Sequence, residues 1–134
     1  MLLGTIRTLI GVAGGLAVGL ILQESLLAGF DVLFGHDRSL PLELRGVRQP
    51  DAVSSGLMVA IWGLAAFASA AMARAISGHM GGPAISGALW LLAIGLTAGL
   101  AQFDTWAFHA AWLAGLVGTL AGGWLASRLD RPNA

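Results

Sequence analysis

The chain contains no cysteine and few charged side chains, and both shortages limit what the protein can be. Without cysteine there is no disulfide, thiolate nucleophile, iron–sulfur ligation or cysteine-bound zinc. Charged residues make up 10% of the 134 residues, whereas soluble domains carry about 25%. This is too little charge to cover a surface that faces water. The formal net charge of zero also gives no indication of a nucleic-acid partner.

Recognised catalytic motifs are absent as well. The sequence has no G-x-S-x-G, no phosphate-binding G-x-x-x-x-G-K and no H-E-x-x-H. Four residues could in principle gather around zinc: His36, Asp37, Asp104 and His109. No two of them have the close spacing of a recognised metal motif. We therefore expect a protein that is not an enzyme, with no catalytic residues, no metal and no cofactor.

Apolar residues dominate the sequence instead. They account for 57% of the chain, and the mean hydropathy is +0.81. A helix needs about 20 mainly apolar residues to cross a membrane. Four segments meet this length, at about residues 8–30, 53–73, 83–103 and 106–127. The first is longer than the roughly 7–15 apolar residues of a signal-peptide core, so it is interpreted as a retained helix.

These segments predict one all-α membrane domain over residues 1–134, with four transmembrane helices in an up-down-up-down bundle. The loop between the first two helices, Asp31–Ala52, is long and polar, and a surface helical turn is expected near Leu40–Val47. Residues 74–82 contain three glycines and predict a flexible turn. The last connection, Asp104 and Thr105, is so short that the helices beside it must be antiparallel neighbours.

Arginine placement predicts the orientation. Four crossings put both termini and the second loop on one side, which carries Arg7, Arg74, Arg128 and Arg131 against Asp130 alone. On the other side three arginines are outweighed by acidic residues. Positive residues near helix ends tend to stay in the cytoplasm, so we expect cytoplasmic termini.

Small residues recur at helical spacing on each predicted span. The candidate helix-packing residues are Gly11, Gly15, Gly19, Gly95, Gly99, Gly118 and Gly122. Lipid is as apolar as leucine, so membrane helices associate through close packing at such positions. The glycines either pack the bundle internally or form a partner-binding face. Trp106 and Trp124 suit the membrane interface, whereas Trp62, Trp90 and Trp112 are expected to fill gaps.

Glu24 is the one ionisable residue clearly inside a predicted span, and such a residue is a functional candidate. It lies about 9 Å from the outer end of its helix, at 1.5 Å per residue. Other polar residues are predicted at the same level: Gln23, Gln102, Asp104 and His109. They could converge into a polar pocket that binds protons or a cation. Alternatively, Glu24 pairs with His109 or an outer-loop arginine, or reaches interfacial water.

Several motifs resemble a family of small, uncharacterised four-helix bacterial inner-membrane proteins. The matching segments are G-L-A-V-G-L-I-L-Q-E, A-S-A-A-M-A-R-A-I-S-G, F-D-T-W-A-F-H and T-L-A-G-G-W-L-A. The resemblance covers most of the chain, although the proline usual in the third connection of that family is missing. It implies a multi-pass protein of the bacterial inner membrane and implies no activity.

Two functions remain open from the sequence. The first is a non-enzymatic scaffold or accessory subunit that packs against partner transmembrane helices through its small-residue faces. The second is a small oligomeric proton-coupled transporter or channel that uses Glu24. The expected partners are the lipid bilayer and either other membrane subunits or further copies of this chain.

Overall fold

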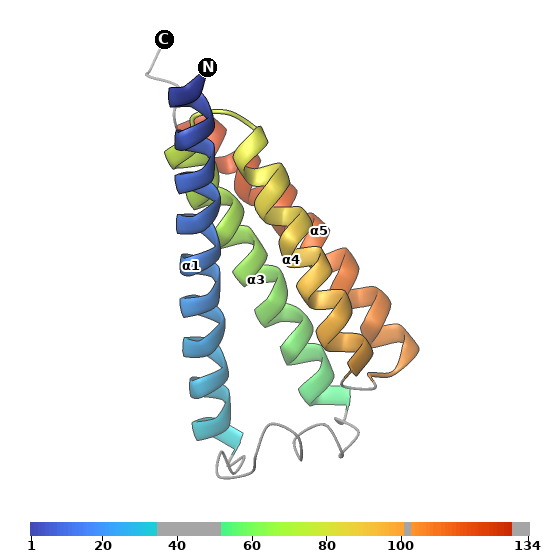
Figure 1. Ribbon diagram of the computed structural model, residues 1–134. Coiled ribbons are helices and arrows are strands. Elements are labelled where there is room, and N and C mark those ends of the chain that lie inside the picture. The colour runs from blue at the N-terminus through green and yellow to red at the C-terminus, as the bar shows by residue number, and fades with distance from the viewer. Residues whose placement is uncertain (35–51, 101–102, 130–134) are drawn as a thin grey trace.

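The computed structural model describes residues 1–34, 52–100 and 103–129. These residues form four helices and no strand: α1 (Leu2–Phe34), α3 (Ala52–Ser77), α4 (Gly81–Leu100) and α5 (Thr105–Leu129) (Figure 1). All four are long and apolar enough to cross a membrane. The predicted all-α fold with four transmembrane helices is confirmed, and the protein is a multi-pass membrane protein. The surface turn predicted at residues 40–47 lies outside the described residues.

The first two helices are longer than the apolar runs that predicted them. α1 begins at Leu2 rather than Thr8, and α3 ends at Ser77 rather than Ala73. Arg74, which was predicted in a loop, is therefore helical. These boundaries were wrong because hydropathy marks only the part of a helix that suits lipid, whereas residues such as leucine, arginine and alanine continue a helix beyond it.

α4 is displaced toward the N-terminus relative to its prediction. It begins at Gly81 rather than Pro83 and ends at Leu100 rather than Phe103. Pro83 still lies in the first turn, where its missing N–H removes no intrahelical bond. The Phe103 N–H bonds to the Ala98 carbonyl oxygen at 3.4 Å, a wider turn than an α-helix makes, so Phe103 belongs to the connection.

A short turn closed by hydrogen bonds joins α3 to α4. Gly78 has a φ of 77°, in the left-handed region that glycine enters without a Cβ penalty. Its N–H donates to the Arg74 carbonyl oxygen at 2.9 Å. The Ser77 hydroxyl donates to the His79 carbonyl oxygen at 3.0 Å. The turn is therefore shorter than predicted and is held at both ends.

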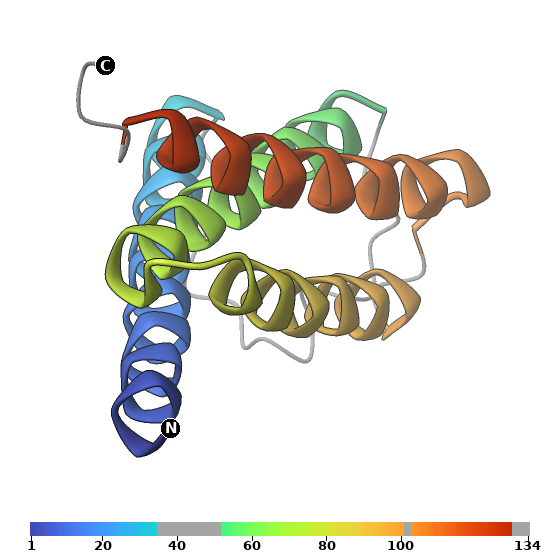
Figure 2. The ribbon, with the colours of Figure 1, turned by 90° about the horizontal axis from the view of Figure 1, so that it is seen from above.

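α3 is the central helix of the bundle. It lies against α1, α4 and α5 (Figure 2), whereas no Cα atoms of α1 and α5 lie within 8 Å of each other. α1 and α3 are antiparallel where they touch, since Gly11 lies against Ala73 and Gly19 lies against Ala65. Because the connection between these helices lies outside the described residues, the up-down order across a membrane stays a prediction.

Large side chains fill the interior where the helices diverge. Trp62 is 2% exposed and Trp90 is 4% exposed, and both belong to a core cluster with Ile94 and Ala111. The Trp62 ring meets Phe103 edge-on, with 5.5 Å between the ring centroids. The prediction that these two tryptophans fill the interior is confirmed. The cluster contains residues of α3, α4 and α5 and therefore joins these three helices.

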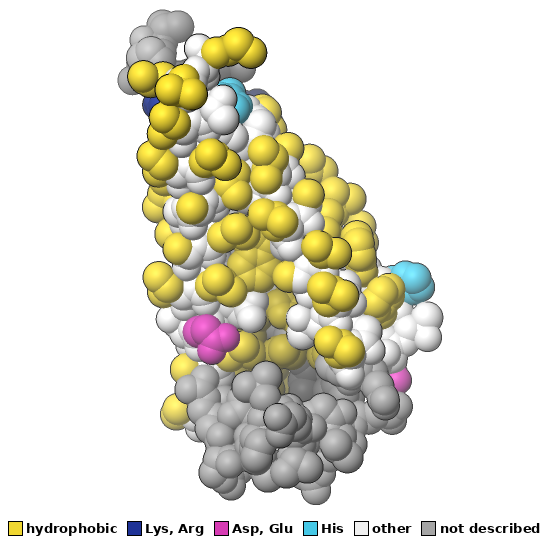
Figure 3. All heavy atoms as spheres, viewed as in Figure 1, with side chains coloured by type: hydrophobic (Ala, Val, Ile, Leu, Met, Phe, Trp, Pro, Cys, Tyr) yellow, Lys and Arg dark blue, Asp and Glu magenta, His cyan; other side chains and the backbone are white. Residues whose placement is uncertain are grey.

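The remaining tryptophans lie at the surface. Trp106 and Trp124 near the two ends of α5 are exposed, as predicted for interfacial residues. Trp112 is 40% exposed, so it covers the side of Gly95 rather than filling a gap. Hydrophobic side chains cover most of the visible face along the helices, and the arginines of the described residues that this view shows lie at the end near the N-terminus (Figure 3). An apolar exterior of this kind suits contact with lipid.

Candidate functional site

The predicted polar pocket begins with two residues on α1. The Glu24 side chain is exposed, and Gln23 is half-buried. Within the described residues, Glu24 has no hydrogen bond or ion pair. Its carboxylate therefore lies on the outer surface of α1 and does not point into the bundle.

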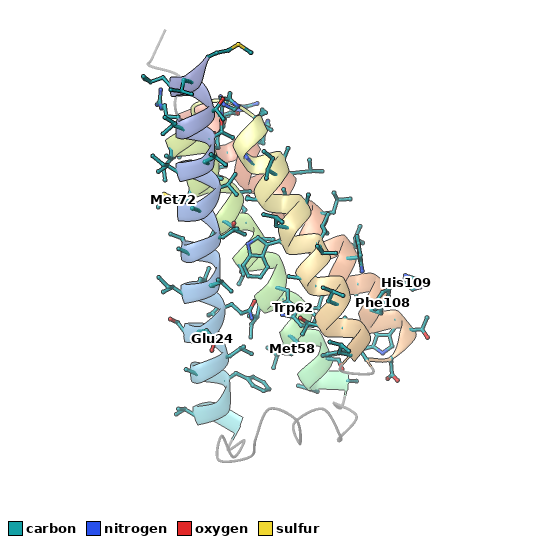
Figure 4. The ribbon with its side chains drawn as sticks, viewed as in Figure 1. Glu24, Met58, Trp62, Met72, Phe108 and His109 are labelled. Carbon is teal, nitrogen blue, oxygen red and sulfur yellow. The ribbon has the colours of Figure 1, made fainter. Side chains whose placement is uncertain are left out.

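The other members of the predicted pocket lie on the far side of the bundle. Asp104 and His109, at the start of α5, are both exposed. The His109 ring packs edge-on against Phe108, with 5.7 Å between centroids. Glu24 and His109 lie on opposite flanks, on two helices that do not touch (Figure 4). The predicted convergence does not occur among these residues, and Gln102 lies outside the described residues.

The depth of Glu24 follows from its register on α1. Gly19 lies against Trp90, which is in the middle of the 20 residues of α4. Glu24 comes five residues later, or about 7.5 Å further along the axis at 1.5 Å per residue. A hydrocarbon core about 30 Å thick extends about 15 Å either side of its middle. When α4 spans the membrane centrally, Glu24 therefore lies within the hydrocarbon.

The predicted packing glycines divide into internal positions and one open position. A methyl group on Gly15 would lie 2.5 Å from the Ser69 carbonyl oxygen, and one on Gly11 would lie 2.9 Å from that of Ala73. Gly19, Gly118 and Gly122 likewise meet backbone carbonyl oxygens of α3, and Gly95 meets the ring of Trp112. A methyl group on Gly99 would meet nothing within 4 Å. Of the two interpretations that the sequence left open, internal packing describes six of these seven glycines.

A polar cluster that was not predicted ties α1 to the turn between α3 and α4. The Gly81 N–H donates to His79 Nδ1 at 3.0 Å, so this ring nitrogen carries no proton. A neutral ring then carries its proton on Nε2, which lies 2.9 Å from Thr8 Oγ1 and donates to it. The Thr8 hydroxyl in turn donates to the Gly4 carbonyl oxygen at 2.8 Å. One histidine thus bonds both to α1 and to a free N–H in the first turn of α4.

Arg7 adds a second link between the same elements. Its Nε donates to the Ile76 carbonyl oxygen at 3.1 Å, which satisfies a free carbonyl in the last turn of α3. The only sequence signal for this cluster was a histidine and an arginine near predicted helix ends. Their positions in the sequence do not predict that their side chains contact the same elements.

We expect a measurable coupling between Thr8 and His79. Thr8→Val and His79→Ala each break the bond between the two side chains, so the double variant should lose less stability than the sum of the singles. The expected coupling is about 0.5–1 kcal/mol, the usual net value of one neutral hydrogen bond. The measurement is unfolding in mixed micelles followed by tryptophan fluorescence. Thr5→Val is the control, because within the described residues the Thr5 hydroxyl bonds only to Met1. Additive losses for Thr8→Val and His79→Ala would contradict the bond between Thr8 and His79.

Three buried side-chain donors have no partner within the described residues: Ser69 Oγ, Trp90 Nε1 and Arg74 Nε. The first two lie in the interior, and Arg74 is half-buried near the end of α3. No group of three His, Asp or Glu side chains is gathered for a metal ion among the described residues, and His36 and Asp37 lie outside them.

Two groups of residues are the candidates for a functional role: Glu24 on the outer face of α1, and the arginines at the other end of the bundle. The resemblance to small four-helix bacterial inner-membrane proteins rests on sequence patterns and stays a prediction. Comparison of the chain with protein-family models, with curated proteins and with solved structures finds no match.

Proposed function

We propose that the protein is a non-enzymatic scaffold or accessory subunit of the bacterial inner membrane that packs against partner transmembrane helices, with its termini in the cytoplasm. The position of Glu24 is the main support. Ionisable residues in membrane spans almost always face a protein interior or a water-filled cavity, because exposure to lipid is costly. An exposed Glu24 at hydrocarbon depth is therefore best explained by a partner that covers it.

The outer face of α1 is suited to such a contact. Ala13, Ala17, Leu20 and Glu24 are all exposed and follow one another at intervals of three or four residues. This spacing places them along one side of the helix. Two alanines allow a partner backbone to approach closely, and a polar or basic partner group would satisfy the carboxylate.

This face replaces the glycine faces as the proposed partner surface. Gly15 and Gly118 are occupied by α3, so a leucine at either position would disrupt the bundle before it could affect a partner. The sequence alone could not separate the two faces, because both carry small residues at the same spacing.

We expect Ala17→Trp to release the partner without unfolding the protein. Ala17 is exposed, so an indole there clashes only with a neighbouring molecule. The measurement is the mass and composition of the intact particle, purified from the native membrane in nanodiscs. Ala93→Trp, at an exposed alanine of α4, is the matched control and should retain the partner. A wild-type particle that contains this chain as a lone monomer would overturn the proposal.

The second candidate is a small oligomeric proton-coupled transporter in which Glu24 lies between copies of the chain. The same exposed carboxylate favours it, because a neighbouring copy would reach Glu24 directly. The two candidates differ in what Glu24→Gln does. In a transporter it abolishes proton-linked flux into proteoliposomes while the homo-oligomer persists. In an accessory subunit there is no flux to lose, and the variant weakens binding of a different protein.

A further inference from the structure

A groove lies on the outside of the bundle along α3. α1 and α5 both lie against α3 without touching each other, so the outward face of α3 forms a floor between two walls. Ala68, Ala71 and Ala75 line the floor, Val18 lines one wall, and Leu125 and Leu129 line the other. The groove has a volume of about 320 Å³ and an almost entirely apolar lining.

Three helices carry an arginine at the end of the bundle toward which one end of the groove lies. Ala75 and Leu129 line this end, and they adjoin Arg74 and Arg128 in the chain. Arg7 reaches the same end from α1, because its Nε lies 3.1 Å from the Ile76 carbonyl oxygen. No acidic residue lies at this end among the described residues, whose acids are Glu24, Asp31 and Asp104.

Not every nitrogen of these guanidinium groups is free to bind a lipid. The Nη atoms of Arg7 make no hydrogen bond within the described residues. The Nε of Arg74 also lacks a partner there but is buried, so it adds positive charge rather than a direct contact. The Arg128 guanidinium stacks on Trp124, 4.3 Å from the ring centroid, and makes no hydrogen bond within the described residues. Stacking on an interfacial tryptophan places this charge at the level of lipid headgroups.

We propose that this groove binds an anionic phospholipid, with one acyl chain along the alanine floor and the phosphate at Arg7 and Arg128, next to the charge of Arg74. Phosphate oxygens match the donors of arginine in geometry and charge. Basic sites between transmembrane helices bind anionic headgroups in this way. A partner helix is a poorer occupant, because a helix with side chains is about 10–12 Å across and needs far more room than this groove provides.

The proposal separates the contributions of the headgroup and the chain. Arginine near the membrane surface attracts anionic lipid, and each arginine removed should weaken binding roughly fivefold. The chain contribution depends on open space over Ala68, which a phenylalanine side chain would fill. Neither effect depends on whether the protein has a protein partner.

The test is a titration of the intact protein with phosphatidylglycerol and with phosphatidylcholine of identical chains, with bound lipid counted by native mass spectrometry. One phosphatidylglycerol should bind at concentrations where phosphatidylcholine does not. Arg7→Gln with Arg128→Gln should reduce that preference at least about tenfold. Ala68→Phe should weaken binding of both lipids, whereas Ala93→Phe on α4 should leave both unchanged.

Several outcomes would overturn the proposal. Equal affinities for phosphatidylglycerol and phosphatidylcholine would show that the arginines do not select an anionic headgroup. An unchanged affinity in Ala68→Phe, in a protein that unfolds at the wild-type denaturant concentration, would place the lipid elsewhere. If Ala68→Phe spared lipid binding but released a protein from the native particle, the groove would hold a partner segment instead. Binding of glycerol 1-phosphate as tight as that of phosphatidylglycerol would show a phosphate site without a chain site.

Discussion

Replacing Gly122 with leucine should unfold the contact between α3 and α5. A Cβ atom at this position would overlap the backbone carbonyl oxygen of Phe67, and one turn earlier Gly118 meets the carbonyl oxygen of Gly63 in the same way. Backbone atoms cannot rotate aside as a side chain can, so the two helices must move apart. Forcing extra atoms into a packed site usually costs 1–3 kcal/mol, and we expect about 3 kcal/mol or more here.

The effect of Gly122→Leu should extend along the whole crossing. Separation at Gly122 also opens the contact at Gly118 and the approach of Gly63 to Ala114. Membrane helices have little hydrophobic drive to reassociate, so lost packing is not recovered elsewhere. The measurement is the midpoint of unfolding in mixed micelles containing sodium dodecyl sulfate, followed by tryptophan fluorescence.

Gly99→Leu is the matched control for this prediction. A Cβ atom on Gly99 would have no neighbouring atom within 4 Å, so leucine should be accommodated there. Leucine also has a higher helix propensity than glycine, and stability should stay the same or rise by up to about 1 kcal/mol. If Gly122→Leu and Gly99→Leu unfolded at the same midpoint, α3 and α5 would not approach as closely as described.

Trp62→Ala should be the most damaging substitution in the core. Trp62 is 2% exposed and is the largest of the fully buried side chains. It packs with Trp90 and Ile94 of α4 and Ala111 of α5, and meets Phe103 edge-on. Truncating a buried tryptophan removes these contacts and leaves a cavity that rigid helices close only in part. The expected loss of stability is about 3–5 kcal/mol.

The control for Trp62→Ala is Trp106→Ala, at the start of α5. The Trp106 side chain is 48% exposed, so its removal leaves no internal cavity, and the unfolding midpoint should change much less. The remaining four tryptophans supply the fluorescence signal in both variants. Equal losses would mean that the interior near Trp62 is looser than the burial of this ring indicates.

The number of helices was predictable from the sequence, but their ends were less so. Each span is a run of apolar residues near the length that a bilayer requires, and this property is local to the segment. The extension of α3 to Ser77 depended on the left-handed Gly78 and its bond to Arg74, which no hydropathy pattern records. The end of α4 likewise depended on the turn at Phe103.

The candidate site was predicted less well, because residues at the same membrane depth do not have to point toward one another. Glu24, Asp104 and His109 were placed at one depth from their positions in the chain. Their side chains nevertheless point outward from two helices that do not touch. Conversely, Thr8 and His79 lie 71 residues apart and have no pattern in common, yet their side chains are 2.9 Å apart.

The sequence by itself determined the class of the protein, the four membrane spans and the positions where helices can approach closely. Only the tertiary structure decided which face of each helix turns inward, so that Gly15 packs against α3 while Ala17, two residues away, is exposed. The physical reason is the solvent. In water an apolar stripe marks the buried face of a helix, whereas in lipid both faces are apolar and hydropathy gives no direction. Steric fit between backbones then selects the inner face, and that fit exists only once the helices are assembled.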